Sequence, residues 1–350
     1  MKGSADGGLQ GRIEVRGFRA GDEKQLTELF GACFGKARSV EEFAWRFQRG
    51  PYPTQFLIAE MRDRTVGACC AWVLPGWVCS ELTDISSGGD FMVDPAFRGL
   101  GISKVLSRST KRPASSLSVY FGQVHVPGLG IRQVGQLPQW VRWEQASALR
   151  ADALWLPLPM ARLAVTATRV VGRRVPVGRR RFRCREVTLE TFGEVEAVLD
   201  GLALRSRDFA PFIMRRDAVH LRWRWLDRPD PWRVVVARGV GTGPAAVCGY
   251  VAFKVVDAQC HIGDMLALDA SAMGALIRAV ADMSSQESPE RTLFELNDPR
   301  PWSSRVLRLA GFLPRGQGPE VSLRLNDERL PESLCRLSSF YLTAGDTDLV

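Results

Sequence analysis

The chain contains an internal repeat, and a repeat constrains the architecture more than any other feature of a sequence. The motif Phe-Ala-Trp-Arg-Phe in the first half and Leu-Arg-Trp-Arg-Trp in the second are each followed by a proline-bearing turn, an apolar stretch and a glycine. Three pairs of anchor residues lie 174 to 182 positions apart: Trp45 and Trp223, Gly67 and Gly249, and Asp90 and Asp264. The sequence therefore predicts two similar units rather than one large domain.

Each half predicts the same succession of elements. An opening strand precedes an amphipathic helix, a short tryptophan-bearing helix, two strands, a strand that leads into a further helix, and a last strand followed by a short helix and a closing strand. In the first half we expect strands at 13–18, 56–61, 66–74, 89–93 and 117–121 and the crossover helix at 101–112. In the second we expect strands at 183–187, 234–237, 246–255, 262–268 and 292–296 and the helix at 272–284. Strands that are first antiparallel and then parallel around a crossover helix predict an α/β fold with two mixed sheets flanked by helices.

The length of 350 residues suits two domains joined by a linker. We predict a first domain at 1–155, a basic linker at 156–181, a second domain at 182–328 and a C-terminal extension at 329–350. The run 173–181 holds the densest positive charge of the chain. Such a run is either a solvated linker or a docking strip for an anionic partner such as tRNA or a carrier protein.

Composition narrows the class of protein. Hydrophobic residues make up 45% and charged residues 24% of the chain, as is typical of a globular protein. The net charge of +9 favours an anionic partner, for which coenzyme A, nucleic acid and anionic lipid all qualify. The apolar stretches fall short of the ~20 residues that span a bilayer, and the N-terminus lacks the apolar core of a secretory signal. Eight scattered cysteines and three histidines without metal-ligand spacing predict reduced, buried thiols in a cytoplasmic protein without a metal site.

The segment from Asp90 to Leu106 carries the strongest chemical signal. An apolar strand leads through a Pro-marked turn into a loop with one arginine and two glycines, Arg98-Gly99-Leu100-Gly101, and then into an amphipathic helix. Glycines allow main-chain N–H groups to approach a ligand closely, and a helix N-terminus attracts anions. Arg98 adds a charged donor and Ser103 a hydroxyl. The pattern therefore predicts a site for a diphosphate.

This segment resembles the acyl-CoA loop of the GNAT superfamily of N-acetyltransferases, which reads [QR]-x-x-G-x-[GA] after the fourth strand. The residues from Arg98 to Ser103 match at Arg98 and Gly101 and depart at Ser103, where serine replaces the last small residue. The resemblance covers most of residues 12–145. It implies that the loop, including Gly99, Leu100 and Ile102, binds acetyl-CoA or another acyl-CoA as co-substrate. It also implies that the backbone at Met92 and Val93 holds the pantetheine arm.

The second half is similar to the same superfamily in its closing part, which includes the sequence Leu309-Ala310-Gly311-Phe312. After Leu268, however, it reads Asp-Ala-Ser-Ala-Met-Gly, without an arginine or a glycine-rich loop. We therefore expect a tandem protein whose second domain is degenerate, lacks an acyl-CoA site, and supports the first domain or forms part of the acceptor pocket.

Three residues are candidates for proton transfer. In the family an amine attacks the thioester directly, so a base must deprotonate an ammonium and an acid must protonate the thiolate. Asp90, on the fourth strand, is the candidate carboxylate base, with an ordered water as the alternative. Tyr120, on the fifth strand, is the candidate acid, and His125 just beyond it could serve as either. For each, a structural role is the alternative interpretation.

Three functions remain open. The leading hypothesis is an N-acyltransferase, most simply an N-acetyltransferase, that transfers an acyl group from CoA to the amine of a small molecule. One alternative is an amide-forming enzyme that uses aminoacyl-tRNA or a carrier-protein thioester as donor. The other is a non-catalytic acyl-CoA-binding scaffold. The acceptor, the acyl chain length and the oligomeric state are not encoded in any recognisable motif.

Overall fold

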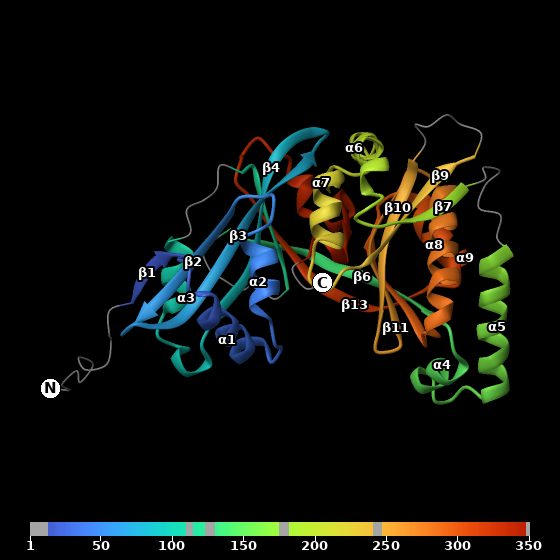
Figure 1. Cartoon of the computed structure of the whole chain (residues 1–350), viewed down its shortest axis with the longest axis horizontal. Helices are drawn as coiled ribbons and strands as arrows, with labels where there is room; N and C mark the ends of the chain where they lie inside the picture. The colour runs from blue at the N-terminus through green and yellow to red at the C-terminus, as the bar shows by residue number, and fades with distance from the viewer. Residues whose placement is uncertain (1–12, 110–114, 123–129, 175–181, 241–246, 348–350) are drawn as a thin grey trace. The chain divides into compact units, whose positions relative to one another are not determined.

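The computed structural model describes residues 13–109, 115–122, 130–174, 182–240 and 247–347 (Figure 1). The chain forms two compact units. Unit 1 comprises Met1–Pro75, Thr83–Arg132 and Ser322–Leu330, and unit 2 comprises Gly76–Leu82, Gln133–Val321 and Pro331–Val350. Each unit therefore takes short segments from the other half of the sequence.

Unit 1 is built on a mixed sheet with strand order β1-β2-β3-β4-β5. Its elements are β1 (Glu14–Gly17), α1 (Glu23–Phe34), α2 (Val40–Phe47), β2 (Thr54–Met61), β3 (Arg64–Val78), β4 (Glu81–Val93), α3 (Ile102–Ser109) and β5 (Leu117–Phe121). The β1–β2 and β2–β3 pairs are antiparallel, whereas β4 and β5 are parallel. Parallel neighbours require a crossover, and α3 supplies it.

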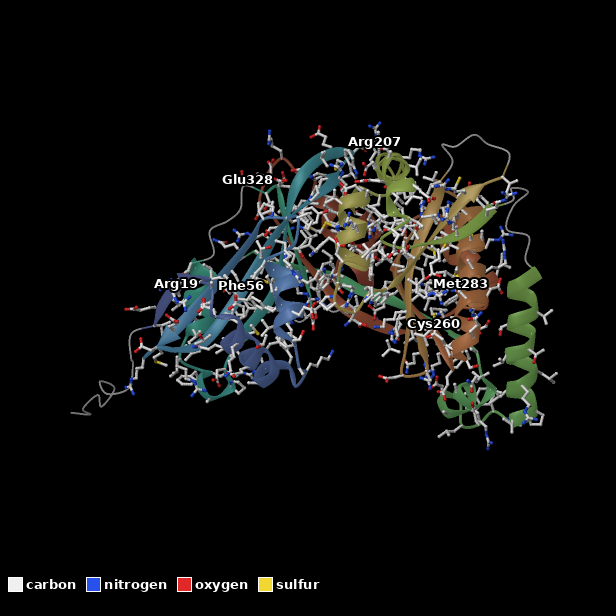
Figure 2. All side chains as sticks on the ribbon, in the orientation of Figure 1. Arg19, Phe56, Arg207, Cys260, Met283 and Glu328 are labelled. Carbon is white, nitrogen blue, oxygen red and sulfur yellow. The ribbon has the colours of Figure 1, made fainter. Side chains whose placement is uncertain are left out.

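Local sequence explains the elements of unit 1. The α1 helix buries Leu26 and Leu29 on one face and ends at Gly35, whose φ of 67° lies in the left-handed region. Arg62 and Asp63 both have positive φ, which is the geometry of a tight two-residue hairpin turn. The Phe56 ring, labelled in Figure 2, packs edge-on against the Phe47 ring at 5.1 Å between centroids. The amphipathic helix predicted after the opening strand and the predicted pair of strands that follows are both present.

Unit 2 has a sheet of the same strand order and directions, with β7-β9-β10-β11-β12 in place of β1 to β5. Its strands are antiparallel up to β11, and β11 and β12 are parallel. The elements are α6 (Glu196–Arg205), α7 (Ala218–Leu221) followed by a π-helical turn (Arg222–Leu226), α8 (Ala270–Ser284), α9 (Pro301–Leu309), and strands β7 (Phe182–Val187), β8 (Phe212–Met214), β9 (Arg233–Gly239), β10 (Val247–Val256), β11 (Gln259–Ala267) and β12 (Arg291–Asn297). Cys260 and Met283, on β11 and α8, mark its core in Figure 2. The mixed α/β class predicted from the sequence is confirmed.

Each half of the sequence supplies a closing strand to the other half's unit. Strand β6 (Arg132–Trp143) runs antiparallel to β12, with Arg291 opposite Trp143. It is followed by α4 (Ala146–Asp152), which also belongs to unit 2. Strand β13 (Leu313–Leu325) ends in unit 1, where the Asn326 side chain donates to the Ser118 hydroxyl at 2.9 Å. The compact units therefore do not divide the sequence at single positions, and the domain boundaries at 155 and 182 stay a prediction.

The predicted linker and extension have regular structure where they are described. Helix α5 (Leu158–Arg174) spans most of 156–181, and 175–181 lie outside the described residues. Strand β14 (Phe340–Thr343) is fully buried and pairs with both β12 and β8. None of the helices in the described part of the chain combines the length and apolar composition needed to cross a bilayer.

The cysteines differ in part from expectation. None of the eight forms a disulfide, and Cys69, Cys70, Cys248 and Cys260 are buried. Cys79, however, is exposed, and the other three are half-buried. The expectation of uniformly buried thiols is therefore wrong, because Cys79 lies at the turn between β3 and β4 rather than within a strand.

A glycine lies beneath the crossover helix in each unit. A Cβ built on Gly67 would lie 2.8 Å from Ile102 Cγ2 and 3.0 Å from the Met92 carbonyl oxygen. A Cβ on Gly249 would meet the Leu266 carbonyl oxygen at 2.6 Å and Leu276 at 3.0 Å. The glycines of the sequence repeat thus permit the same close approach of helix and sheet.

Replacing Gly67 tests this close approach. Valine favours strands, so Gly67→Val on β3 would stabilise the protein if space allowed. We expect instead a loss of roughly 1–3 kcal/mol in the free energy of unfolding, because the added methyls displace α3 or the β4 backbone. Urea unfolding measures this. Gly17→Val is the matched control, since nothing lies within 4 Å of a Cβ there, and an equal effect of both variants would contradict the packing explanation.

Candidate functional site

The parallel strands β4 and β5 separate partway along their length. Their pairing runs from Ile85 opposite Leu117 to Gly88 opposite Tyr120. Strand β4 then continues to Val93, whereas β5 ends at Phe121. Residues 89–93 therefore have no described partner strand on the β5 side. Such a separation leaves main-chain donors and acceptors that need a partner.

Strand β4 carries a distortion where this separation begins. Asp90 has a φ of 45°, in the left-handed region that aspartate tolerates better than most residues. Two residues further on, Met92 is buried in the core of unit 1. The Val93 carbonyl oxygen accepts from Cys33 Sγ and from Arg98 Nε, each at 3.4 Å, while the next amide, that of Asp94, donates to Val66 on β3. The Val93 carbonyl and the Asp94 N–H belong to one peptide group and point in opposite directions, so the Val93 carbonyl faces away from β3.

The predicted phosphate loop is exposed and ends at the N-terminus of α3. Arg98, Gly99 and Leu100 are exposed, Gly101 and Ser103 are half-buried, and Ile102 is buried. Gly99 and Gly101 have φ values of 87° and 78°, which only glycine adopts without strain. A Cβ at either position would meet nothing within 4 Å, so the space in front of both glycines is open.

The loop amides are available for a ligand. No described residue accepts a hydrogen bond from the backbone N–H groups of residues 99–103. The first amides of the helix that have a backbone acceptor are those of Lys104 and Val105, which both donate to the Gly101 carbonyl. Free N–H groups at the positive end of a helix dipole form a site for anions. The arrangement is therefore suited to a diphosphate.

Charged and apolar contacts fix the position of the loop at residues 98–101 and of the helix α3 that follows it. Asp94 accepts from the Ala96 amide at 2.9 Å and pairs with Arg64 at 2.8 Å. Ile102 and Leu106 anchor the helix on the sheet. Burial raises the pKa of the Cys33 thiol, while the nearby Arg98 guanidinium opposes this shift. Arg98 thus lies at the junction of α1, β4 and the loop.

Asp90 takes part in a buried ion pair. Arg38 Nη2 donates to Asp90 Oδ1 at 3.1 Å, and Nη1 contacts the other carboxylate oxygen. The exposed fractions of the two side chains are 3% and 4%. To accept a proton from an ammonium, Asp90 would have to give up this pair. Arg38 was not singled out in the sequence, although it directly precedes the cap of the tryptophan-bearing helix.

The second unit contains the same pair. Arg216 Nε donates to Asp264 at 3.1 Å, and both side chains are buried. Arg216 lies 178 positions after Arg38, and Asp264 lies 174 after Asp90, so the repeat preserves the pair. Because unit 2 has no glycine-rich loop in the corresponding place, the ion pair is explained by the architecture without reference to a ligand.

Tyr120 lies on β5 at the last pair before the strands separate. Its ring covers Gly88, where a Cβ would be 2.8 Å from the ring. Burial raises the pKa of the Tyr120 hydroxyl, opposed by a hydrogen bond with Ser118. The phenol is therefore protonated at neutral pH and able to donate. His125 lies outside the described residues.

In unit 2 the corresponding separation of β11 and β12 is filled by the chain itself. Their pairing ends at Ile262 opposite Phe294, and β14 then pairs with the end of β12. The Tyr341 hydroxyl donates to the Met265 carbonyl on β11, and the Thr343 hydroxyl donates to Asp264 at 2.8 Å. Residues 340–343 of the predicted C-terminal extension thus pack into this gap.

The helix that follows β11 also differs from α3. The N-cap of α8 is Asp269, whose carboxylate accepts from the Ala272 amide at 2.8 Å. A carboxylate at this position occupies an amide and repels an anion. Among the described residues, no cluster of three His, Cys, Asp or Glu side chains could hold a metal ion.

Solved structures share this fold. One is a protein of unknown function from Enterococcus faecalis described as a probable N-acyltransferase, with 14% identity and a TM-score of 0.62 over 90% of this chain and 72% of that one. A GCN5-related N-acetyltransferase from Kribbella flavida has 15% identity and a TM-score of 0.58 over 90% of this chain and 71% of its own. A GCN5-related N-acetyltransferase from Anabaena variabilis has 12% identity and a TM-score of 0.63 over 90% of this chain and 73% of its own. The chain therefore has the fold of these proteins. No match was found among protein-family models or curated proteins.

The ion pair can be tested as a structural element. Asp90→Asn keeps the tolerance for positive φ but leaves the buried Arg38 guanidinium with only Glu42, whose carboxylate is 3.7 Å from Nε and partly exposed, so we expect a loss of about 3 kcal/mol in the free energy of unfolding. The double variant Arg38→Met, Asp90→Asn removes the buried charge and is expected to be more stable than Asp90→Asn alone. Urea unfolding checks both values. A single variant as stable as the unchanged protein would contradict a structural role for the pair.

Proposed function

We propose that the chain is an acyl-CoA-dependent N-acyltransferase, with its co-substrate bound to unit 1. The observation that carries the proposal is the set of free backbone amides at residues 99–103, beside two strands that separate. The names of the structural neighbours support acyl transfer to an amine as the class of reaction. A small-molecule amine is the proposed acceptor, and acetyl-CoA is the simplest donor.

The diphosphate of the co-substrate is proposed to bind at the loop. Gly99 and Gly101 have positive φ, and a Cβ at either position would meet nothing within 4 Å, so a ligand can approach their backbone closely. The Arg98 guanidinium, which is exposed, adds a charge-assisted donor. The Ser103 hydroxyl lies in the first turn of the same helix. These groups together provide the donors and the positive potential that two phosphates require.

The pantetheine arm is proposed to run along β4 as an added strand. Its amides would pair with the Val93 carbonyl, which faces away from β3, and its thioester would reach the region between Asp90 and Tyr120. The Met92 side chain is buried in the core and so holds this part of β4 in place. Unit 2 offers no comparable edge, because β14 occupies it.

The reaction is proposed to be a direct transfer. The amine lone pair attacks the thioester carbonyl carbon, a C–N bond forms, and the C–S bond breaks. Tyr120 donates its proton to the departing thiolate, as a protonated phenol at the end of the strand pair can do. For the proton lost by the amine, an ordered water is the better proposal than Asp90, because the Asp90 carboxylate is committed to Arg38. His125 stays a prediction from the sequence.

Ligand-induced stabilisation tests the donor site. CoA or acetyl-CoA at about 100 times its dissociation constant is expected to add ~2.7 kcal/mol to the free energy of unfolding, a shift of several degrees in Tm. Arg98→Ala is expected to weaken binding roughly tenfold or more through loss of a charge-assisted hydrogen bond. Gly101→Val is expected to abolish the shift, because valine cannot adopt the φ of this position.

The control variant for these measurements is Arg207→Ala, which removes an exposed arginine of unit 2 and should leave the CoA-dependent shift unchanged. The donor alternatives are separated by adding tRNA or an acylated carrier protein in place of CoA. A shift with tRNA or carrier protein and none with CoA would overturn the donor assignment. A CoA shift without acetyl transfer to any amine in a thiol-release assay would support the scaffold instead.

A further inference from the structure

The α4–α5 connection exposes two large apolar side chains. Leu154 and Trp155 have exposed fractions of 84% and 81%, although both are residues that normally avoid water. They lie between the end of α4 and the start of α5, in unit 2. Figure 1 shows both helices at the margin of this unit. Exposed apolar side chains mark an interaction site when they form part of a larger patch.

Helix α5 is apolar on two faces. Ala161 and Val165 are buried against unit 2. Met160, Leu163 and Val170 are exposed by 56%, 71% and 43%. At 100° per residue these three lie on one stripe, on the side of the helix away from Ala161 and Val165. Ordinary packing within the unit accounts for the first face but leaves the second uncovered.

The charge of this region has one sign. In sequence, residues 153–185 contain nine arginines and no aspartate, glutamate or lysine. Arg185 pairs with Glu194, at 2.8 Å. Arg162, between Met160 and Leu163 in sequence, is exposed. Exposed tryptophan, leucine and arginine side chains in and beside one helix are typical of segments that lie in the interface of an anionic bilayer.

We propose that the exposed apolar side chains of the α4–α5 connection (Leu154 and Trp155) and of α5 (Met160, Leu163 and Val170), together called the α5 face, dock onto the surface of an anionic lipid membrane. The apolar side chains enter the acyl boundary, and the arginines meet the lipid phosphates. The helix lies on the membrane rather than spanning it, in agreement with its composition. This inference does not depend on the proposed acyl transfer.

Two other occupants fit less well. A second copy of the chain would bring the same arginine-rich segment against itself in a two-fold interface, where like charges repel. Nucleic acid would satisfy the arginines, but its phosphate backbone would leave Met160, Leu163 and Val170 without an apolar environment. A membrane satisfies both requirements at once.

Vesicle co-sedimentation of the full chain tests the proposal. The chain is expected to bind vesicles of phosphatidylglycerol and phosphatidylcholine in equal parts, and to bind pure phosphatidylcholine vesicles at least about tenfold more weakly. The double variant Leu154→Ser, Trp155→Ser is expected to lower binding to the anionic vesicles by about tenfold or more. Both positions are exposed, so folding should be unaffected, and a melting curve verifies this.

The control is Leu204→Ser, which replaces an exposed leucine of α6 in the same unit, 53% exposed against 84% for Leu154. It should leave vesicle binding unchanged. The proposal would be overturned if the chain showed no preference for the anionic vesicles, or if the control and the double variant lost binding equally. It would also be overturned if the unchanged chain bound no vesicles but formed a dimer that became a monomer in the double variant. Binding of tRNA that is lost in the double variant, with no vesicle binding, would assign the face to nucleic acid.

Discussion

Backbone groups at the point where two parallel strands separate must find partners, and this constraint organises both units. In unit 2 the need is met by the chain itself, because β14 adds to the end of β12 while Tyr341 and Thr343 contact β11. In unit 1 the described residues offer no such strand beside residues 89–93. The same architecture is thus closed by the protein in one unit and available to a ligand in the other.

The two units share the features that build the sheet and differ in those that would bind an anion. A glycine beneath the crossover helix and a buried arginine–aspartate pair recur in both. Unit 1 alone has glycines at positive φ before its crossover helix, with free amides and an exposed arginine. In unit 2 the crossover helix is α8, and an aspartate, Asp269, caps its N-terminus. The repeated features are therefore structural, and the unshared ones point to function.

Much of the fold could be predicted from the sequence, because it depends on local periodicity and on the repeat. The strand 117–121 and the hairpin at 62–63 have the bounds or geometry that their residues predict. The exchange of β6 and β13 between the units could not be predicted, since a strand's own residues do not specify which sheet it joins. The packing of the C-terminal segment was missed for the same reason.

The candidate site could be located from sequence but not interpreted in full. Glycine spacing indicated the loop, because positive φ and close approach depend on residue type alone. The ion pair of Asp90 with Arg38 could not be predicted from the sequence, because the two residues are 52 positions apart and come into contact only in the folded chain. The repeat held the missing signal: an arginine directly before each tryptophan-bearing helix, at the same spacing as the tryptophans themselves.

Amide hydrogen exchange with and without CoA tests the central claim most directly. If a diphosphate binds the free amides before α3, the peptide that covers 98–104 should exchange more slowly when CoA is added, while the peptide that covers 268–274 before α8 should not change. Protection at 268–274 with none at 98–104 would place the ligand in unit 2 and contradict the proposed site.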